Sequence, residues 1–337
     1  MRELAAPPPA DSLTIVGNSW SKLKQFLAGA DPDRFVVHPW PWENASRPYH
    51  VANRPDDPDG YGGYSRNHRI DDDGLPYYAT PSGRLYDPLV VARFGLKMLA
   101  IADATADASV RHRARGVAPA LIASARSTGA WGRGGAADAM STDRPSGLVQ
   151  GVVLSALLRL SDIPPDRELE GVVDRAFARL AAPVERGGTV ARLDGGPFFE
   201  EFPRLPPSHI LNGCIYALLG VYDLADSLGH REAQDLARAA ESGMARSARR
   251  FVTKTGWSRY ALGVYGHAPL ASLHYHVAHI VLLDVLAQRT GESEFARVSD
   301  VWRRSLLNPG VRVLNASFKA ALTFWMRNVR SLPLQDS

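Results

Sequence analysis

The sequence predicts a mainly α fold, an (α/α) toroid or barrel of helical hairpins with a small N-terminal β-hairpin region. Four apolar, glycine-containing segments with helical patterning begin near Tyr86, Pro145, Pro207 and Leu273, at intervals of 59, 62 and 66 residues. A more charged helical segment follows each of them. Buried helices that alternate with amphipathic ones at a steady period can pair into hairpins arranged in a ring. A plain helical solenoid is the alternative.

The first 85 residues are predicted to form an N-terminal arm and then the β-hairpin region. Residues 1–35 carry a weak apolar stripe, which indicates a short helical or irregular arm. Beyond them, Gly, Pro, Asp and Tyr dominate the sequence. Val36-Val37 and Arg69-Ile70 are candidate strands, and Asp73-Gly74 is a candidate turn.

Residues 86–337 are predicted to form one helical domain that holds the candidate catalytic groups. The four apolar helices would line the inside of the ring, and the charged helices would cover the outside. Each loop that leads into an inner helix would open on the same face of the ring. The outer helices are expected near residues 107–126, 165–183, 230–251 and 292–306.

The composition allows one large core without a disulfide framework. The chain has 337 residues, of which 45% are hydrophobic. Cys214 is the single cysteine, and its apolar neighbours predict a packed thiol rather than a nucleophile. No apolar run has the length that a membrane span requires, and the N-terminus lacks the apolar core of a secretory signal. We therefore expect a cytoplasmic protein.

The formal net charge of +4 comes with many arginines on predicted helices. Most of them, including Arg111, Arg113 and Arg115, are expected to lie on solvated helix faces. Arginine also meets carboxylates and sulfates in a bidentate way, which would suit a polyanionic substrate. A nucleic-acid partner is not expected, because no basic run with interleaved aromatic residues occurs.

The candidate catalytic groups lie at the predicted starts of the inner helices. Glu200 and Glu201 stand on a loop stiffened by three prolines, directly before an almost uncharged helix. A carboxylate at the mouth of a buried helix is suited to proton transfer, and solvated acids are the alternative. The other groups at these starts are Tyr78, Arg84, Tyr86, Gln150, Asn212, Arg259, Tyr260, Tyr275, His276 and His279.

The histidines near the fourth inner helix do not predict a metal site. His276 and His279 share a helix face, but no His-Glu-x-x-His pattern and no cysteine pair accompanies them. They are interpreted as hydrogen-bonded residues of a pocket wall. Tyr275 is a better acid–base candidate, and its phenol would need a nearby cation such as Arg259 to ionise near neutral pH. An aromatic spacer in the core is the alternative for Tyr275.

Three segments resemble the C-terminal domain of D-glucuronyl C5-epimerases. The resemblance covers roughly residues 70–308, and the segment that combines Glu-Glu, Leu-Asn-Gly and Tyr-Asp-Leu is the most specific. The similar runs are Tyr86-Asp87-Pro88 through Leu96, Glu200-Glu201-Phe202-Pro203 through Tyr222-Asp223-Leu224, and Ala268-Pro269-Leu270-Ala271 through His279.

The resemblance implies a helical (α/α) barrel behind a β-hairpin region, in a short, bacterial-type member of the family. It implies an isomerase that interconverts D-glucuronate and L-iduronate units in a polysaccharide such as heparosan. The reaction removes the C5 proton and returns a proton to the opposite face of the sugar. The expected partner is thus an anionic uronate-containing polysaccharide, and no cofactor is required.

By the same resemblance, Glu201 matches the family's catalytic glutamate and Tyr275 its catalytic tyrosine. The family also uses a Tyr and an Arg three residues apart, which Trp257-Ser258-Arg259-Tyr260 does not match cleanly. Arg259 and Tyr260 are the other two candidate catalytic residues, and the chemistry assigns them to the substrate carboxylate. Phe202 stands where animal members have a tyrosine, so it cannot carry a proton. The larger β-domain of animal members is missing or much reduced, so no metal is carried over from it. The expected substrate-binding residues are Tyr78, Arg84, Tyr86, Gln150, Glu200, Asn212, His276 and His279.

Other functions remain open on the sequence. A polysaccharide lyase would make the same enolate and then expel the O4 substituent. An inactive uronate-binding protein is a third class. A glycoside hydrolase is disfavoured, because adjacent Glu200 and Glu201 cannot flank a glycosidic bond. The oligomeric state is open, with a homodimer among the alternatives, since the apolar residues Leu322, Phe324, Trp325 and Met326 could cover an exposed side of the ring or a partner subunit.

Overall fold

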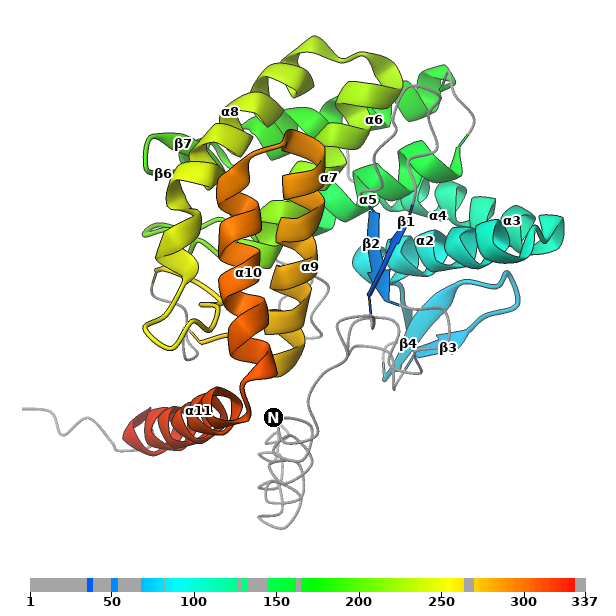
Figure 1. Cartoon of the computed structure of the whole chain (residues 1–337). Helices are drawn as coiled ribbons and strands as arrows, with labels where there is room; N and C mark the ends of the chain where they lie inside the picture. The colour runs from blue at the N-terminus through cyan, green and yellow to red at the C-terminus, as the bar shows by residue number, and fades with distance from the viewer. Residues whose placement is uncertain are drawn as a thin grey trace, which may run out of the picture.

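The computed structural model describes residues 35–38, 50–53, 68–81, 83–125, 129–132, 145–161, 165–263 and 270–330. Within these ranges the protein is mostly helical, with short strands at its N-terminal side (Figure 1). The arm predicted for residues 1–35 lies outside the described residues, except for Phe35. The side chains of residues 322–326 also lie outside them.

Four apolar helices form the inner layer of the described residues, and each begins close to its predicted start. Asp87 caps the first, because its side chain accepts a hydrogen bond from the Leu89 N–H, and Ser272 caps the fourth in the same way through Tyr275. Every residue of the second helix is buried. The inner helices are α2 (Pro88–Thr105), α5 (Gly147–Leu160), α7 (Leu211–Leu228) and α9 (Leu273–Thr290).

Amphipathic helices cover the inner layer and complete the hairpins. Figure 1 shows α10 beside α9, and α8 packs on α7 in the same manner. Their apolar residues recur at helical spacing and are buried, whereas the other positions face solvent. The predicted helical hairpins are thereby confirmed. The outer helices are α3 (Ala108–Arg115), α4 (Val117–Ser124), α6 (Arg167–Ala181), α8 (Arg231–Ser247) and α10 (Ser293–Leu307).

The first outer element differs from the single helix predicted for residues 107–126. Gly116 separates α3 from α4. Pro119 lies in the first turn of α4 and has no N–H to donate to the carbonyl of Arg115. One continuous helix therefore cannot form across this position.

The predicted strands and turn of the N-terminal region are confirmed. β1 (Phe35–His38) pairs with β2 (His50–Asn53), and β4 (Pro76–Thr80) lies between β3 (His68–Ile70) and β5 (Gly83–Leu85), all antiparallel. At the turn, Gly74 has a φ of 81°. β1 contacts α9 and β2 contacts α2, so this hairpin stands between the first and last inner helices (Figure 1). It bridges the two ends of the inner layer, as a ring requires.

A second hairpin was not predicted. β6 (Val190–Leu193) and β7 (Gly196–Phe199) are antiparallel and lie against α8. Asp194 and Gly195 form the two-residue turn, both with positive φ. Asp-Gly between short apolar runs favours such a hairpin, so the signal was present in the sequence. The hairpin matters because β7 ends directly before Glu200.

Helices α5 and α7 approach until their backbones touch. A Cβ atom on Gly151 would lie 2.4 Å from the Ala217 Cα, and one on Gly220 would lie 2.4 Å from the Gly151 carbonyl oxygen. Glycine is therefore required at both positions, because no side chain fits between the helices. This contact fixes the spacing of the two central inner helices.

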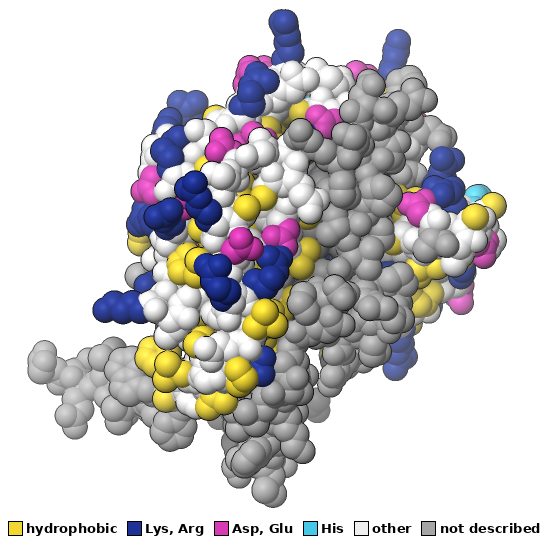
Figure 2. Space-filling view, viewed as in Figure 1, with side chains coloured by type: hydrophobic (Ala, Val, Ile, Leu, Met, Phe, Trp, Pro, Cys, Tyr) yellow, Lys and Arg dark blue, Asp and Glu magenta, His cyan; other side chains and the backbone are white. Residues whose placement is uncertain are grey.

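Most arginines of the outer helices are solvated and lie near acids, as predicted. Figure 2 shows Lys and Arg side chains interspersed with Asp and Glu over the face that α8 and α10 form. On this face, Glu294 contacts both Arg249 and Arg297. On α3, Arg111 contacts Asp103 at 2.6 Å. Exposed ion pairs of this kind contribute little to stability, so these residues serve mainly solubility.

Helix α11 (Pro309–Arg330) carries an exposed apolar face next to α10. Val313, Leu314 and Phe318 are between 42% and 56% exposed, whereas Asn315 and Ala316 are buried. Coverage of an exposed side of the ring, or of a partner subunit, by the apolar residues of 322–326 stays a prediction, since their side chains lie outside the described residues. None of the helices in the described part of the chain combines the length and the hydropathy that a bilayer span requires.

We predict that Gly151→Ala destabilises the protein by about 1–3 kcal/mol, because the added methyl group must push α5 away from α7. Urea unfolding followed by circular dichroism measures this change. Gly171→Ala is the matched control, since its methyl group meets only the flexible end of Arg175 on α6. The control should be neutral or more stable. Equal stability of the two variants would contradict a tight α5–α7 contact.

Candidate active site

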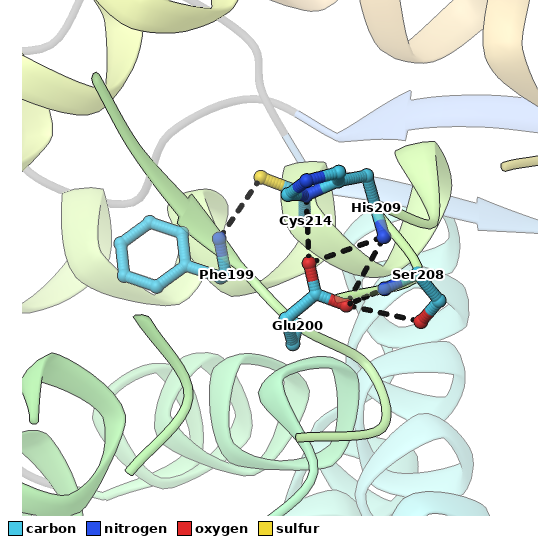
Figure 3. A network of polar contacts seen from close by, with 5 residues as sticks. All are labelled: Phe199, Glu200, Ser208, His209 and Cys214. Carbon is cyan, nitrogen blue, oxygen red and sulfur yellow. Dashed lines mark hydrogen bonds and ion pairs between the residues drawn. The ribbon is translucent and has the colours of Figure 1, made fainter. Parts of the chain in front are cut away.

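The loop between β7 and α7 is organised by the buried carboxylate of Glu200. Figure 3 shows this carboxylate between Ser208 and His209. Its Oε2 accepts hydrogen bonds from the Ser208 N–H and hydroxyl, both at 3.0 Å, and the His209 N–H lies 3.1 Å from both oxygens. The His209 Nδ1 lies 2.8 Å from Oε1. These contacts draw the two ends of the loop together.

The Glu200 backbone extends the same network to two other elements. Its N–H donates to the Thr189 carbonyl at 2.8 Å, and its carbonyl accepts from the Gly147 N–H at the start of α5. His209 has a φ of 50°, a conformation that non-glycine residues seldom adopt and that the surrounding bonds hold in place. Glu200 has no exposed surface. Its contacts are those of a loop-organising residue, and its substrate contact stays a prediction.

Cys214 packs beside this network as predicted. It is buried on α7, and its sulfur accepts a hydrogen bond from the Phe199 N–H at 3.4 Å (Figure 3). Burial raises the pKa of the Cys214 thiol far above its usual range. The thiol therefore stays neutral, which makes it a poor nucleophile.

Glu201 is held against the first turn of α7. Its side chain is 1% exposed. A Cβ atom on Gly213 would lie 2.7 Å from the Glu201 Cβ and 2.8 Å from its Oε2, so the carboxylate reaches α7 only because residue 213 has no side chain. The first residue before α7, Ile210, offers no side-chain cap. The partial positive charge at such a helix start attracts a negatively charged side chain.

The segment 257–261 forms the neighbouring wall and is fastened to α9 by histidines. The Ser258 N–H donates to His276 Nδ1 at 3.1 Å, and the Ser258 hydroxyl lies 2.9 Å from the same atom and 3.0 Å from His279 Nδ1. The Trp257 ring stacks on His276 at 3.7 Å. Both histidines are completely buried and hydrogen-bonded. Whether they contact substrate stays a prediction.

Burial sets the protonation state of these histidines. It lowers the pKa of His276 from 6.5 to about 3. It also lowers the pKa of His279, and His276, His274 and Lys319 add to that decrease. Neutral imidazoles match the geometry, because His276 Nδ1 accepts from Ser258 while its Nε2 lies 3.2 Å from the Trp302 carbonyl.

The structure brings the predicted catalytic side chains into one region. The Leu211 N–H donates to the Tyr260 carbonyl at 3.1 Å, which joins the start of α7 to the segment 257–261. The Tyr260 ring lies 4.8 Å from the Tyr275 ring, and Tyr275 lies 6.4 Å from His279. Glu201, Tyr260 and Tyr275 therefore lie on three elements that are bonded to one another. Arg259 directly precedes Tyr260 in the chain and is half-buried.

Two further residues join this region, and sequence reasoning did not select them. The Arg93 guanidinium lies 5.4 Å from the centre of the Tyr216 ring, which links α2 to α7. Burial raises the pKa of Tyr216, Arg93 opposes the rise, and Tyr275 adds to it. Tyr216 follows Asn212 by four residues, so a shared helix face could have indicated it. Arg93 carried no comparable signal.

The N-terminal sheet holds a separate polar cluster. The Tyr86 hydroxyl donates to Asp71 at 2.6 Å, and the Arg84 guanidinium lies 5.0 Å from the centre of the Tyr77 ring. Tyr86 and Arg84 are exposed. Tyr78 is half-buried, and desolvation raises its pKa. The contacts of Tyr86 and Arg84 stay within this sheet, so their role in binding substrate stays a prediction.

Gln150 holds the backbone rather than facing a solvent-accessible site. It is completely buried on α5. Its oxygen accepts from the Trp131 N–H at 2.6 Å, and its nitrogen donates to the carbonyls of Gly129 and Ala176, each at 3.0 Å. These bonds use both donors and tie the segment 129–131 to α6. Its predicted substrate contact remains untested.

No group of three metal-ligating side chains occurs in the part of the chain that the structure describes. The arrangement instead offers two buried carboxylates, of which Glu200 is occupied by the loop, together with several phenols and an arginine. Carboxylate and phenol are groups that can take and return a proton from carbon. The arginine can bind an anion.

Comparison with known families adds to this chemistry. The profile of the family described as D-glucuronyl C5-epimerase C-terminus matches residues 135–304, which is half of the chain. The chain belongs to this family. The match includes the Glu200 loop, α7, the segment 257–261 and α9, and so contains Glu201, Tyr260 and Tyr275. Arg93 lies before the matched residues.

The relatives of this epimerase-family chain are distant. D-glucuronyl C5-epimerase from Caenorhabditis elegans is 27% identical over 172 residues, which make up 47% of this chain and 28% of that protein. Cellobiose 2-epimerase from Bacillus thermoamylovorans shares the fold, with 12% identity and a TM-score of 0.51 over 70% of this chain and 65% of that one. Unsaturated glucuronyl hydrolase from Bacillus sp. GL1 is more remote, with 18% identity and a TM-score of 0.45 over 64% and 59% of the two chains.

We predict that Glu200→Gln lowers the free energy of unfolding by about 2–4 kcal/mol. The amide removes a buried negative charge and points an N–H group at donors that need an acceptor. Ser208→Ala should cost about 1 kcal/mol, because the backbone donors keep their partner. Chemical unfolding of both variants measures the difference. If Glu200→Gln is as stable as the wild-type protein, the carboxylate does not organise the loop.

We also predict that His276 makes the epimerase-family chain sensitive to acid. The unfolded chain protonates this imidazole near pH 6.5, whereas the folded protein resists until about pH 3, so folding stability falls as pH drops between these values. The contribution is at most about 1.4 kcal/mol per pH unit.

His276→Gln should therefore flatten the fall in stability between pH 6.5 and pH 4.5, even if the variant is less stable at neutral pH. Unfolding free energies at each pH test this slope. His112→Gln, on the exposed surface of α3, should keep the wild-type slope. An unchanged slope in His276→Gln would show that the imidazole already titrates normally in the folded state.

Proposed function

We propose that the helical part of this chain, residues 86–337, is a C5-epimerase that interconverts D-glucuronate and L-iduronate units in a polysaccharide such as heparosan. The observation that carries this proposal is the position of Tyr260, whose carbonyl accepts from the Leu211 N–H at the start of α7 and whose ring lies 4.8 Å from the Tyr275 ring. Glu201 packs against that first turn of α7. Membership of the C5-epimerase family supports the reaction class.

The reaction requires two proton carriers and one anion-binding group. Removal of the C5 proton places a second negative charge next to the carboxylate of the sugar, so donors or an arginine must stabilise the resulting enolate. Inversion then requires that the proton leave one face of the ring and return to the other. The acid and the base must therefore stand on opposite sides of the bound unit.

Glu201 and Tyr275 fill these two roles in our proposal. Glu201 is buried against the start of α7, where the helix dipole favours the carboxylate that a base must supply. Tyr275 lies in the first turn of α9, with the Tyr260 ring beside it. One residue removes the C5 proton of glucuronate and the other protonates the opposite face. The roles exchange in the reverse direction, and no cofactor takes part.

The substrate in this proposal is an anionic polymer rather than a free sugar. Asn212 is 4% exposed, and its side-chain oxygen is buried without a hydrogen-bond partner among the described residues. A buried acceptor without a partner is costly, and a sugar hydroxyl would satisfy it. Tyr78, Arg84 and Tyr86 would contact neighbouring units of the chain.

Proton NMR of heparosan incubated with the full chain in deuterium oxide tests the proposal. We expect the C5 proton signal of glucuronate to fall and iduronate signals to rise, without a new double bond. An unsaturated uronate end would make the protein a lyase and overturn the proposal. Absence of both exchange and iduronate would overturn it for this polymer class.

In the same assay, Glu201→Gln and Tyr275→Phe should each lower the exchange rate by about 10²–10⁴-fold, because each loses one proton carrier. Glu232→Gln, an exposed glutamate in the first turn of α8, is the matched control and should keep the wild-type rate. Thermal unfolding verifies that the variants are folded. Full activity in either site variant would contradict the assigned roles.

A further inference from the structure

We propose that Arg93 binds the carboxylate of the uronate unit and so selects uronate polymers over neutral ones. The inference rests on the proposed epimerase function and adds a residue to it. It starts from the position of Arg93 on α2, an inner helix. The guanidinium lies over the Tyr216 ring of α7, 5.4 Å from its centre, so the side chain extends from α2 toward α7.

Arg93 is half-buried and has no ion pair among the described residues. Two arginines that are largely buried on the other inner helices each have an ion pair. Arg159 lies 3.1 Å from Asp223 inside the α5–α7 contact, and Arg289 lies 2.6 Å from Asp226. A guanidinium stays charged under all ordinary conditions, and partial burial without an anion is unfavourable. Arg93 is therefore prepared for an anion from outside the protein.

The surroundings of Arg93 connect it to the proposed catalytic groups. Its charge opposes the increase that burial causes in the pKa of Tyr216, and Tyr275 also acts on that pKa. The three side chains thus interact through one poorly solvated region. A carboxylate bound to Arg93 would place its sugar ring beside the phenols. The planar guanidinium offers two parallel N–H donors, which match a carboxylate in geometry.

Asp87 is the acid that the charge of Arg93 affects. The Asp87 side chain is occupied as the cap of α2, where it accepts from the Leu89 N–H at 2.9 Å. Burial raises the pKa of Asp87, and Arg93 opposes this rise. Among the described residues, the Asp87 carboxylate and the Arg93 guanidinium do not form an ion pair, so Arg93 acts on Asp87 only through its charge. Asp87 therefore leaves the guanidinium donors available.

Arg259 is the competing candidate, since it is also half-buried without an ion pair among the described residues. The side chains of its neighbours Ser258 and Tyr260 both contact residues of α9. Adjacent residues of an extended segment point in opposite directions, which turns Arg259 away from Tyr275. The observations therefore favour Arg93.

The test measures binding of heparosan and of carboxyl-reduced heparosan in the Glu201→Gln background, in which turnover cannot alter the ligand. Arg93→Gln should weaken binding of heparosan by about ten- to a hundredfold and leave binding of the reduced polymer unchanged. Arg93→Lys, which keeps the charge but loses the paired donors, should fall between. Arg113→Gln, an exposed arginine on α3, should bind as the background protein does.

Each outcome of these binding measurements supports or overturns the assignment of carboxylate binding to Arg93. Equal heparosan binding by Arg93→Gln, or an equal loss for both polymers, would overturn the assignment to Arg93. A selective loss in Arg259→Gln but not in Arg93→Gln would move the role to Arg259. If the wild-type protein neither binds nor epimerises heparosan, the proposed function fails and the role of Arg93 fails with it. Wild-type exchange with unaltered Arg93→Gln discrimination would refute the Arg93 role alone.

Discussion

The Glu200 carboxylate is withdrawn from water and accepts its hydrogen bonds from Ser208 and His209, while the Glu200 backbone bonds to Thr189 and Gly147. The β6–β7 hairpin, the start of α5 and the approach to α7 thus meet at one residue. A charge in a low-dielectric interior strengthens its hydrogen bonds and makes their loss expensive. These bonds also fix the position of Glu201, because it directly follows Glu200 and cannot move without the loop.

The helical architecture could be predicted because it depends on periodicity. Apolar runs at similar intervals predicted the inner helices, and the charged runs between them predicted the outer helices. Local chemistry explains the exceptions. Pro119 splits the first outer helix, and the Asp194-Gly195 turn adds a hairpin too short to leave a hydrophobic pattern. The contact of β1 and β2 with opposite ends of the inner layer has no signature in the sequence at all.

The candidate site could be predicted in part. Family resemblance selected Glu201 and Tyr275, which the structure gathers with Tyr260. Sequence reasoning could recognise polar residues in apolar surroundings, but not which neighbours satisfy them. Gln150 and His276 were selected as binding residues on this ground, and their partners in the protein backbone and on Ser258 could not be foreseen. Tyr216 and Arg93 were missed for the converse reason, since their significance arises from a contact between helices far apart in the sequence.

The backbone contact between α5 and α7 has a consequence for how the protein can diverge. Two helices that touch through Gly151 and Gly220 cannot slide or rotate past each other, so they act as a fixed frame. The loops at the starts of these helices are attached to the frame but do not contribute to it. Changes in ligand preference are therefore expected to accumulate in those loops, while Gly151 and Gly220 of the frame tolerate almost no substitution. The scaffold can in this way acquire new specificities without any change in its fold.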